Sequence, residues 1–170
     1  MTREFTVSDS IVVDATAEDL YDAISDPTHM GSWSPENLGA VVLDPRDSAY
    51  VGMQFDGRNK RGRAQWVTRS TVTVADPGKT FEFRVFAIGV KSPRLKGANA
   101  TWRYDFEPTP QGTKVTETWT DDRRKWPDAV AFVFDKIVTS GKTFPEFQRN
   151  NIRRTLDEFK RVAESSKMTT

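Results

Sequence analysis

An acidic residue stands among apolar ones in the short segment Val115-Thr116-Glu117-Thr118-Trp119. The alternation of this segment predicts a half-buried strand, in which the odd-numbered positions share one face. Glu117 then lies on the face that Val115 and Trp119 mark as interior. A carboxylate that loses its hydration has a raised pKa unless hydrogen bonds or a cation compensate. Glu117 is therefore the first residue of the chain to consider for chemistry.

The strand predicted just before it supplies a partner for this carboxylate. Trp102 and Tyr104 share one face there, and a turn leads into the next strand, so Glu117 should lie opposite Tyr104, or opposite Trp102 in a register two residues away. Two interpretations remain open. Glu117 is satisfied by Tyr104, Asn59 or an arginine in a structural network, or it is a ligand anchor or a general acid/base for enolisation or dehydration. We favour the structural or ligand-anchoring role.

The same strand parity gathers aromatic and small polar side chains on one concave face. The predicted ligand-binding residues on it are Phe55, Asn59, Trp66, Thr68, Phe83, Trp102, Tyr104, Glu117 and Trp119. The aromatic members either fill a core or line a cavity. Asn59, Thr68 and Tyr104 are placed to orient a polar group of a ligand.

Several kinds of chemistry lack the residues they require. His29 is the only histidine and lies in a predicted turn, so we expect it at the surface and expect no histidine metal site and no Ser-His-Asp triad. The absence of cysteine excludes disulfides and thiolate metal sites. No phosphate-binding glycine motif occurs. We expect neither a metal nor a cofactor.

A basic run covers residues 58–63, with Arg69 nearby. Arg58 and Lys60 share the face opposite Phe55, which favours a solvated outer face of the sheet. An interaction protein that uses this basic hairpin is the weaker functional alternative. With 25 basic and 24 acidic residues the net charge is +1, so no nucleic-acid partner is expected.

The elements that position these residues follow from periodicity. An extended segment at 5–13 precedes a short helix that begins after Thr16 and ends near Asp26. Further strands are predicted at residues 40–43, 52–61, 64–74, 81–85, 100–107 and 113–119, and a less regular stretch at 87–97. Helical spacing of Phe147, Ile152, Leu156 and Phe159 predicts a C-terminal helix, and residues 128–140 form an earlier helical piece or a lid-like segment. Nothing divides the chain, so we expect one domain, residues 1–170.

The hydropathy of the chain predicts its relation to membranes. The mean hydropathy is −0.61, and no apolar run approaches the ~20 residues that span a bilayer. The N-terminus has no recognisable secretion signal. We expect a cytoplasmic protein with no membrane span.

Three segments carry a resemblance that covers nearly the whole chain. They are IVVDATAEDLYDAISDPTHMGSWSPE near the start, VGMQFDGRNKRGRAQWVTRSTVTVADPGKTFEFRV in the middle, and WRYDFEPTPQGTKVTETW in the last hairpin. The chain resembles the START-related helix-grip superfamily, also called SRPBCC, in its polyketide cyclase/dehydrase-like branch. This resemblance implies an α+β fold in which a curved antiparallel sheet of about seven strands wraps around a long C-terminal helix. It also implies short helices after the first strand and an apolar internal cavity.

The residues and the resemblance together favour binding of a hydrophobic small molecule in that cavity: a lipid, a polyketide or another aromatic compound. The alternative is a polyketide aromatase/cyclase or dehydratase in which Glu117 and Tyr104 transfer protons. The sequence leaves the identity of the ligand, the occurrence of a reaction and the oligomeric state open.

Overall fold

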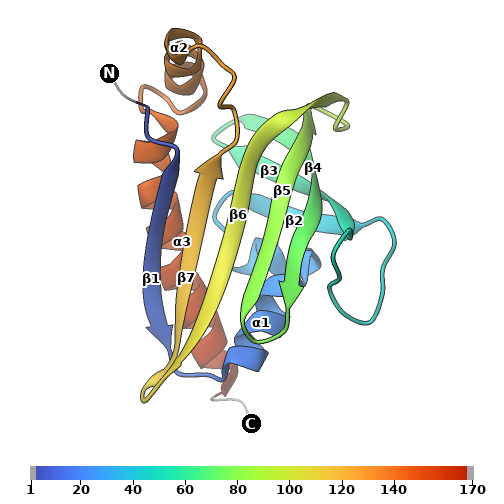
Figure 1. The fold of residues 1–170 in the computed structure, drawn as a ribbon, viewed down its shortest axis with the longest axis vertical. Coiled ribbons are helices and arrows are strands. Elements are labelled where there is room, and N and C mark those ends of the chain that lie inside the picture. Colours follow the sequence, from blue (N-terminus) through green and yellow to red (C-terminus); the bar gives the residue numbers. More distant parts are fainter. Residues whose placement is uncertain (1–2, 168–170) are drawn as a thin grey trace.

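One antiparallel sheet dominates the computed structural model, which describes residues 3–167 (Figure 1). Within those residues the sheet has seven strands in the order β1-β7-β6-β5-β4-β3-β2. Their bounds are β1 Thr6–Val13, β2 Asn37–Val42, β3 Gln54–Arg61, β4 Ala64–Asp76, β5 Thr80–Gly89, β6 Leu95–Thr109 and β7 Gly112–Asp121. The predicted sheet of about seven strands is confirmed.

Helices cover one face of this sheet. The short elements α1 (Ala17–Ser25) and η1 (Pro27–Ser32) follow β1, while α2 (Asp128–Val138) and the long α3 (Phe144–Lys167) follow β7. The N-cap Thr16 accepts a hydrogen bond from the backbone of Asp19 at 3.1 Å, as the sequence predicts. Figure 1 shows α3 along β1 and β7, which it contacts. None of the helices in residues 3–167 is long and apolar enough to cross a membrane.

The strands are longer than the sequence predicts around residues 87–97. The pairs Ala87↔Lys96 and Ile88↔Leu95 continue the ladder between β5 and β6, so only residues 90–94 form the turn. Backbone pairing extends this hairpin beyond the point where one face is covered. Several side chains there are exposed on both faces, so the alternation that reveals a strand is lost.

The core lies between the sheet and the helices. Leu20 and Ile24 from α1 and Ile152 and Leu156 from α3 are buried in it together with side chains of the concave face. The final hairpin is held against the end of β1 by Gly112, whose φ is +127° and where an added Cβ would lie 2.2 Å from the Val13 carbonyl oxygen. This contact places β7 between β1 and β6, with its inward side chains under α3.

Candidate functional site

Glu117 and Tyr104 face each other across the last hairpin. Tyr104 pairs with Glu117, and Trp102 pairs with Trp119, which is the first of the two registers considered from the sequence. The Tyr104 hydroxyl donates a hydrogen bond of 3.0 Å to Oε1 of Glu117. The Glu117 side chain is 1% exposed, and its Oε2 has no hydrogen-bond partner among the described residues. The carboxyl group is thus half satisfied.

Burial controls the protonation of this pair. The pKa of Glu117 is raised to about 8, mainly by loss of hydration. The hydrogen bond from Tyr104 opposes this rise, and the negative charge of Asp9 adds to it. Burial, the charge of Glu117 and the hydrogen bond to it raise the pKa of Tyr104 well above 10. Glu117 is therefore mainly a neutral acid at pH 7. Since Oε1 accepts from Tyr104, the proton is left to Oε2, where no group within residues 3–167 accepts a hydrogen bond from it.

A second acid lies beside Glu117 but has its own cation. Asp9 on β1 pairs with Glu117 on β7, so the two side chains share the concave face. Arg153 of α3 donates to Oδ2 of Asp9 at 3.1 Å. The positive charge from α3 therefore goes to Asp9. Asp9 and Arg153 are not among the predicted site residues, although the alternation of β1 already indicates that Asp9 faces inward.

Aromatic rings surround the Tyr104 end of the pair. Trp33, directly after η1, packs edge-on against Tyr104 with ring centres 6.3 Å apart and against Phe159 of α3 at 5.4 Å. Trp119 stacks on Phe144 at the start of α3, 6.1 Å away. Trp33 was also missed, because it lies in an irregular segment where no periodicity assigns it to a face.

The predicted site residues divide into two groups by burial. The sealed group is buried beneath the helices: Phe55, Phe83, Tyr104, Glu117 and Trp119. The half-buried group consists of Asn59, Trp66, Thr68 and Trp102. Asn59 Nδ2 donates to Thr68 Oγ1 at 3.2 Å, so these two predicted polar anchors bond to each other. The half-buried group is the accessible part of the concave face.

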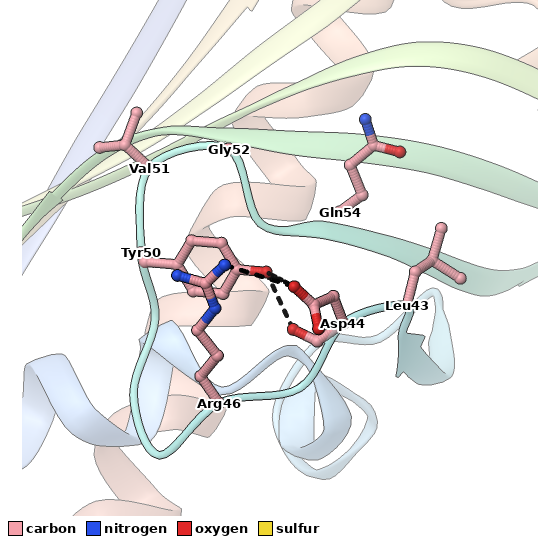
Figure 2. Close-up of a pocket in the computed structure, with 7 residues that line it drawn as sticks. All are labelled: Leu43, Asp44, Arg46, Tyr50, Val51, Gly52 and Gln54. Atoms are coloured by element: carbon pink, nitrogen blue, oxygen red, sulfur yellow. Dashed lines mark hydrogen bonds and ion pairs between the residues drawn. The ribbon is translucent and has the colours of Figure 1, made fainter.

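Open space lies elsewhere. One hollow of about 390 Å³ is bordered by residues 43–54, and Figure 2 shows Arg46 over the Tyr50 ring and the Tyr50 hydroxyl bonded to Asp44. Another hollow lies along residues 89–95. Neither is lined by a predicted site residue. The rings of the sealed group pack against one another, as Phe55 and Phe83 do at 5.2 Å, so the predicted internal cavity stays a prediction.

Arg61 differs from the rest of the basic run. It turns inward, where Nη2 donates to Glu36 Oε2 at 2.9 Å and Nη1 donates to the carbonyl oxygen of Val138 at 2.9 Å. Its guanidinium also lies 3.9 Å from the ring centre of Phe147 and 5.4 Å from that of Trp66. Arg61 therefore joins β3 to α2 and α3 beside the half-buried group.

The remaining polar residues lie either at the surface, as Arg58, Lys60 and His29 were expected to, or in the core, where no polar residue of α3 was predicted. Arg58 and Lys60 are exposed, as is His29, whose Nδ1 lies 2.9 Å from Asp26. Residues 3–167 contain no group of three or more His, Cys, Asp or Glu side chains arranged to hold a metal ion. Gln148, Asn151 and Thr155 are buried polar residues of α3. Their burial could not be predicted from the sequence, because they are polar and lie near charged residues along the chain.

Known proteins share this architecture. A polyketide cyclase-like protein of Corynebacterium glutamicum is 29% identical, with a TM-score of 0.58 over 98% of this chain and 95% of that one. A START superfamily protein of Mycobacterium smegmatis is 14% identical, with a TM-score of 0.68 over 95% of this chain and 99% of the other. The di-domain ARO/CYC StfQ of the steffimycin biosynthetic pathway is 18% identical, with a TM-score of 0.68 over 95% of this chain and 52% of StfQ. The last two likenesses show a common fold.

Sequence comparison gives the family. No protein of curated function matches the chain. The family described as polyketide cyclase / dehydrase and lipid transport matches residues 4–164, nearly the full length. The chain therefore belongs to this polyketide cyclase / dehydrase and lipid transport family, and its curved sheet and long C-terminal helix agree with the fold of the structures above.

Proposed function

We propose that the protein binds a hydrophobic small molecule between the concave face of the sheet and α3. The observation that carries this proposal is the Glu117 carboxyl group, which is buried among aromatic rings and whose Oε2 has no partner within residues 3–167. A buried polar atom without a partner is costly, and a structural network normally satisfies such an atom. A ligand oxygen in contact with Oε2 would remove that cost.

The protonation of Glu117 defines the ligand chemistry. A neutral carboxyl group donates one hydrogen bond, so the matching ligand group is a carbonyl or hydroxyl oxygen on a mainly apolar body. Phe83, Trp102 and Trp119 would contact that body, and Tyr104 would orient the carboxyl group. A lipid, a polyketide or another aromatic compound meets this description. A free anion does not, because no cation among residues 3–167 is paired with the Glu117 carboxyl group.

The half-buried group gives this ligand a route. Trp66 and Trp102 keep part of their surface accessible, whereas Glu117 does not. A ligand would therefore enter past Trp66 and Trp102 and displace aromatic rings as it approaches Glu117. Arg61 borders this route and holds the ends of α2 and α3 beside it.

Native mass spectrometry of the protein as purified tests the binding function. We expect an apolar molecule to copurify with the wild type and to be depleted in Glu117→Leu, which keeps the apolar surface and removes the donor. Glu107→Leu, on the exposed part of β6, is the matched control and should retain the molecule. Absence of any bound molecule after expression in several hosts would count against the proposal.

Proton transfer is the second candidate function. A pKa of about 8 places the titration of Glu117 near neutral pH, where a general acid/base works best. Tyr104 keeps its proton at that pH, so its role would be to orient Glu117 and donate a hydrogen bond. Glu117→Gln should then abolish cyclisation or dehydration of a poly-β-ketone and leave its binding intact. Unchanged turnover would exclude the proton-transfer role.

A further inference from the structure

The helix α2 turns an apolar stripe toward solvent. Val133 and Phe134 lie three and four residues after Val130 and four and three residues before Ile137, so these four residues share one helix face. These four side chains are between 40% and 74% exposed. Large apolar side chains gathered in one exposed patch mark an interaction surface.

The opposite face of α2 holds the helix in this orientation. Ala131 is buried, and Asp135 Oδ1 accepts a hydrogen bond of 2.9 Å from Arg123. Oδ2 of Asp135 accepts from the backbone of Phe144 at 3.1 Å. Because a buried ion pair and the start of α3 both hold Asp135, the helix cannot rotate to hide its stripe without breaking them.

A second apolar projection lies at the same end of the molecule. Val90, in the connection between β5 and β6, is 79% exposed, and Leu95, the first residue of β6, is 71% exposed. The backbone of Asp122, which leads into α2, donates to the carbonyl oxygen of Asn99 at 3.1 Å, next to this connection. Figure 1 shows α2 and the β5–β6 connection at the same, upper end of the molecule, toward opposite sides of it. We call residues 89–97 and 123–142 the apical segments.

Positive charge surrounds these apolar side chains. The exposed basic residues of the apical segments are Lys91, Arg94, Lys96, Arg124, Lys125, Lys136 and Lys142. Asp128 is the exposed acid on these segments, since Asp135 is buried against Arg123. The whole chain carries a net charge of only +1, so the excess of positive charge is local. Such a surface is complementary to an anionic one.

We propose that the apical segments dock on the surface of an anionic phospholipid bilayer. Apolar side chains on two separate projections would enter the interfacial region, and the basic residues around them would meet the lipid phosphates. The 11 residues of α2 extend only about 16 Å, which suits a helix lying in the interface. A second copy of the chain is a poorer occupant, because a symmetric contact would bring two basic surfaces together.

Cosedimentation with lipid vesicles tests this inference without any small-molecule ligand, so the outcome is independent of the proposed function. We expect the wild type to bind vesicles of equimolar phosphatidylglycerol and phosphatidylcholine, and to bind pure phosphatidylcholine vesicles at least about tenfold less. Added salt should weaken binding, because it screens the phosphates. Equal binding to both kinds of vesicle, or no binding to either, would overturn the proposal.

Matched variants assign the surface. The double variant Val133→Asp with Ile137→Asp should reduce vesicle binding about tenfold or more, because it places charge in the interface. The control Val41→Asp with Val51→Asp changes residues that are 61% and 64% exposed outside the apical segments, and it should bind as the wild type does. An equal loss in both double variants would contradict the proposed surface.

A second pair of double variants tests the contribution of the basic residues to vesicle binding. Lys91→Glu with Lys125→Glu should reduce binding about tenfold or more. Lys79→Glu with Lys114→Glu should not, because Lys79 lies in the β4–β5 turn and Lys114 near the start of β7, outside the apical segments. Sedimentation velocity without vesicles provides the last check. A dimer that dissociates in the Val133→Asp, Ile137→Asp variant would assign the stripe to self-association and overturn the lipid proposal.

Discussion

Glu117 is the residue on which the proposed chemistry depends. Its position on the inward face of β7 and its pairing with Tyr104 could both be predicted from alternation and from the short turn between the strands. Its relation to Asp9 and Arg153 could not, because β1 contacts β7 and α3 through residues more than 100 positions away in the chain. The lack of a partner for Oε2 could not be predicted either. It depends on whether Arg153 of α3 pairs with Glu117 or with Asp9.

Stability should depend on pH through Glu117. The pKa of this carboxyl group rises from 4.5 in the unfolded chain to about 8 in the folded protein. The folded state then binds the proton more tightly, so this contribution is complete below pH 4.5 and is lost as the pH rises through about 8. We expect the free energy of unfolding of the wild type to fall between pH 5 and pH 9 by more than that of Glu117→Gln.

Urea denaturation at several pH values measures this difference. Glu107→Gln, which removes an exposed carboxylate from the neighbouring strand, should keep the pH dependence of the wild type. Identical pH profiles for the wild type and Glu117→Gln would show that Glu117 is not a buried acid with a raised pKa.

Tyr104→Phe isolates the hydrogen bond to Glu117. The substitution leaves Oε1 buried without a donor, so we expect a loss of about 1–2 kcal/mol in the free energy of unfolding at pH 6. Tyr50→Phe removes a comparable hydroxyl from an exposed loop and should cost less than about 1 kcal/mol. Equal losses in the two variants would mean that the buried hydrogen bond stabilises the fold no more than an exposed one does.

At the scale of elements, the attachment of α2 depends on a buried charge network. Arg123 donates to both oxygens of Asp121 and also to Asp135, so the end of β7 is joined to α2. Arg3 bonds to Asp121 from the N-terminal side at 3.0 Å. The lid-like or helical segment predicted at residues 128–140 is therefore a helix with a fixed anchor.

Arg123→Ala should strongly destabilise this region. It leaves Asp121 and Asp135 buried without their main cation, which costs about 3–5 kcal/mol in comparable cases. Chemical denaturation measures the loss, and hydrogen exchange should show reduced protection of α2 and of the start of α3. Arg84→Ala breaks a pair whose arginine is exposed and should change stability by no more than about 1 kcal/mol. Unchanged protection of α2 in Arg123→Ala would refute the anchor.

Sequence periodicity predicted the elements well where one face is covered and poorly where it is not. The strands around Tyr104 and Glu117 alternate clearly because α3 and the short helices cover one of their faces. The ends of β5 and β6 extend beyond that cover, and their alternation disappears there. The inward partners of Arg61 were missed for a related reason, since only the positions of α2 and α3 show what its guanidinium contacts.

At the scale of the whole molecule, the resemblance to the helix-grip superfamily predicted the sheet, the short helices and the long C-terminal helix correctly. It also implied a cavity, whereas the sealed group is packed with aromatic rings. A fold determines where such a space would lie, and the sizes of Trp33, Trp119 and Phe159 determine how much of it is filled. Binding would therefore require these rings to move.

The central claim is that a neutral Glu117 donates a hydrogen bond to an apolar ligand. Prodan, a neutral naphthalene with one carbonyl acceptor, is a suitable fluorescent probe, and its dissociation constant measured from pH 6 to pH 9.5 is the most direct test. We expect the affinity of the wild type to fall about tenfold as Glu117 ionises through about pH 8. Glu117→Gln keeps a donor and should bind equally across this range, and Glu117→Leu should bind weakly throughout. Equal, pH-independent affinity in all three proteins, or no binding by the wild type, would contradict the claim.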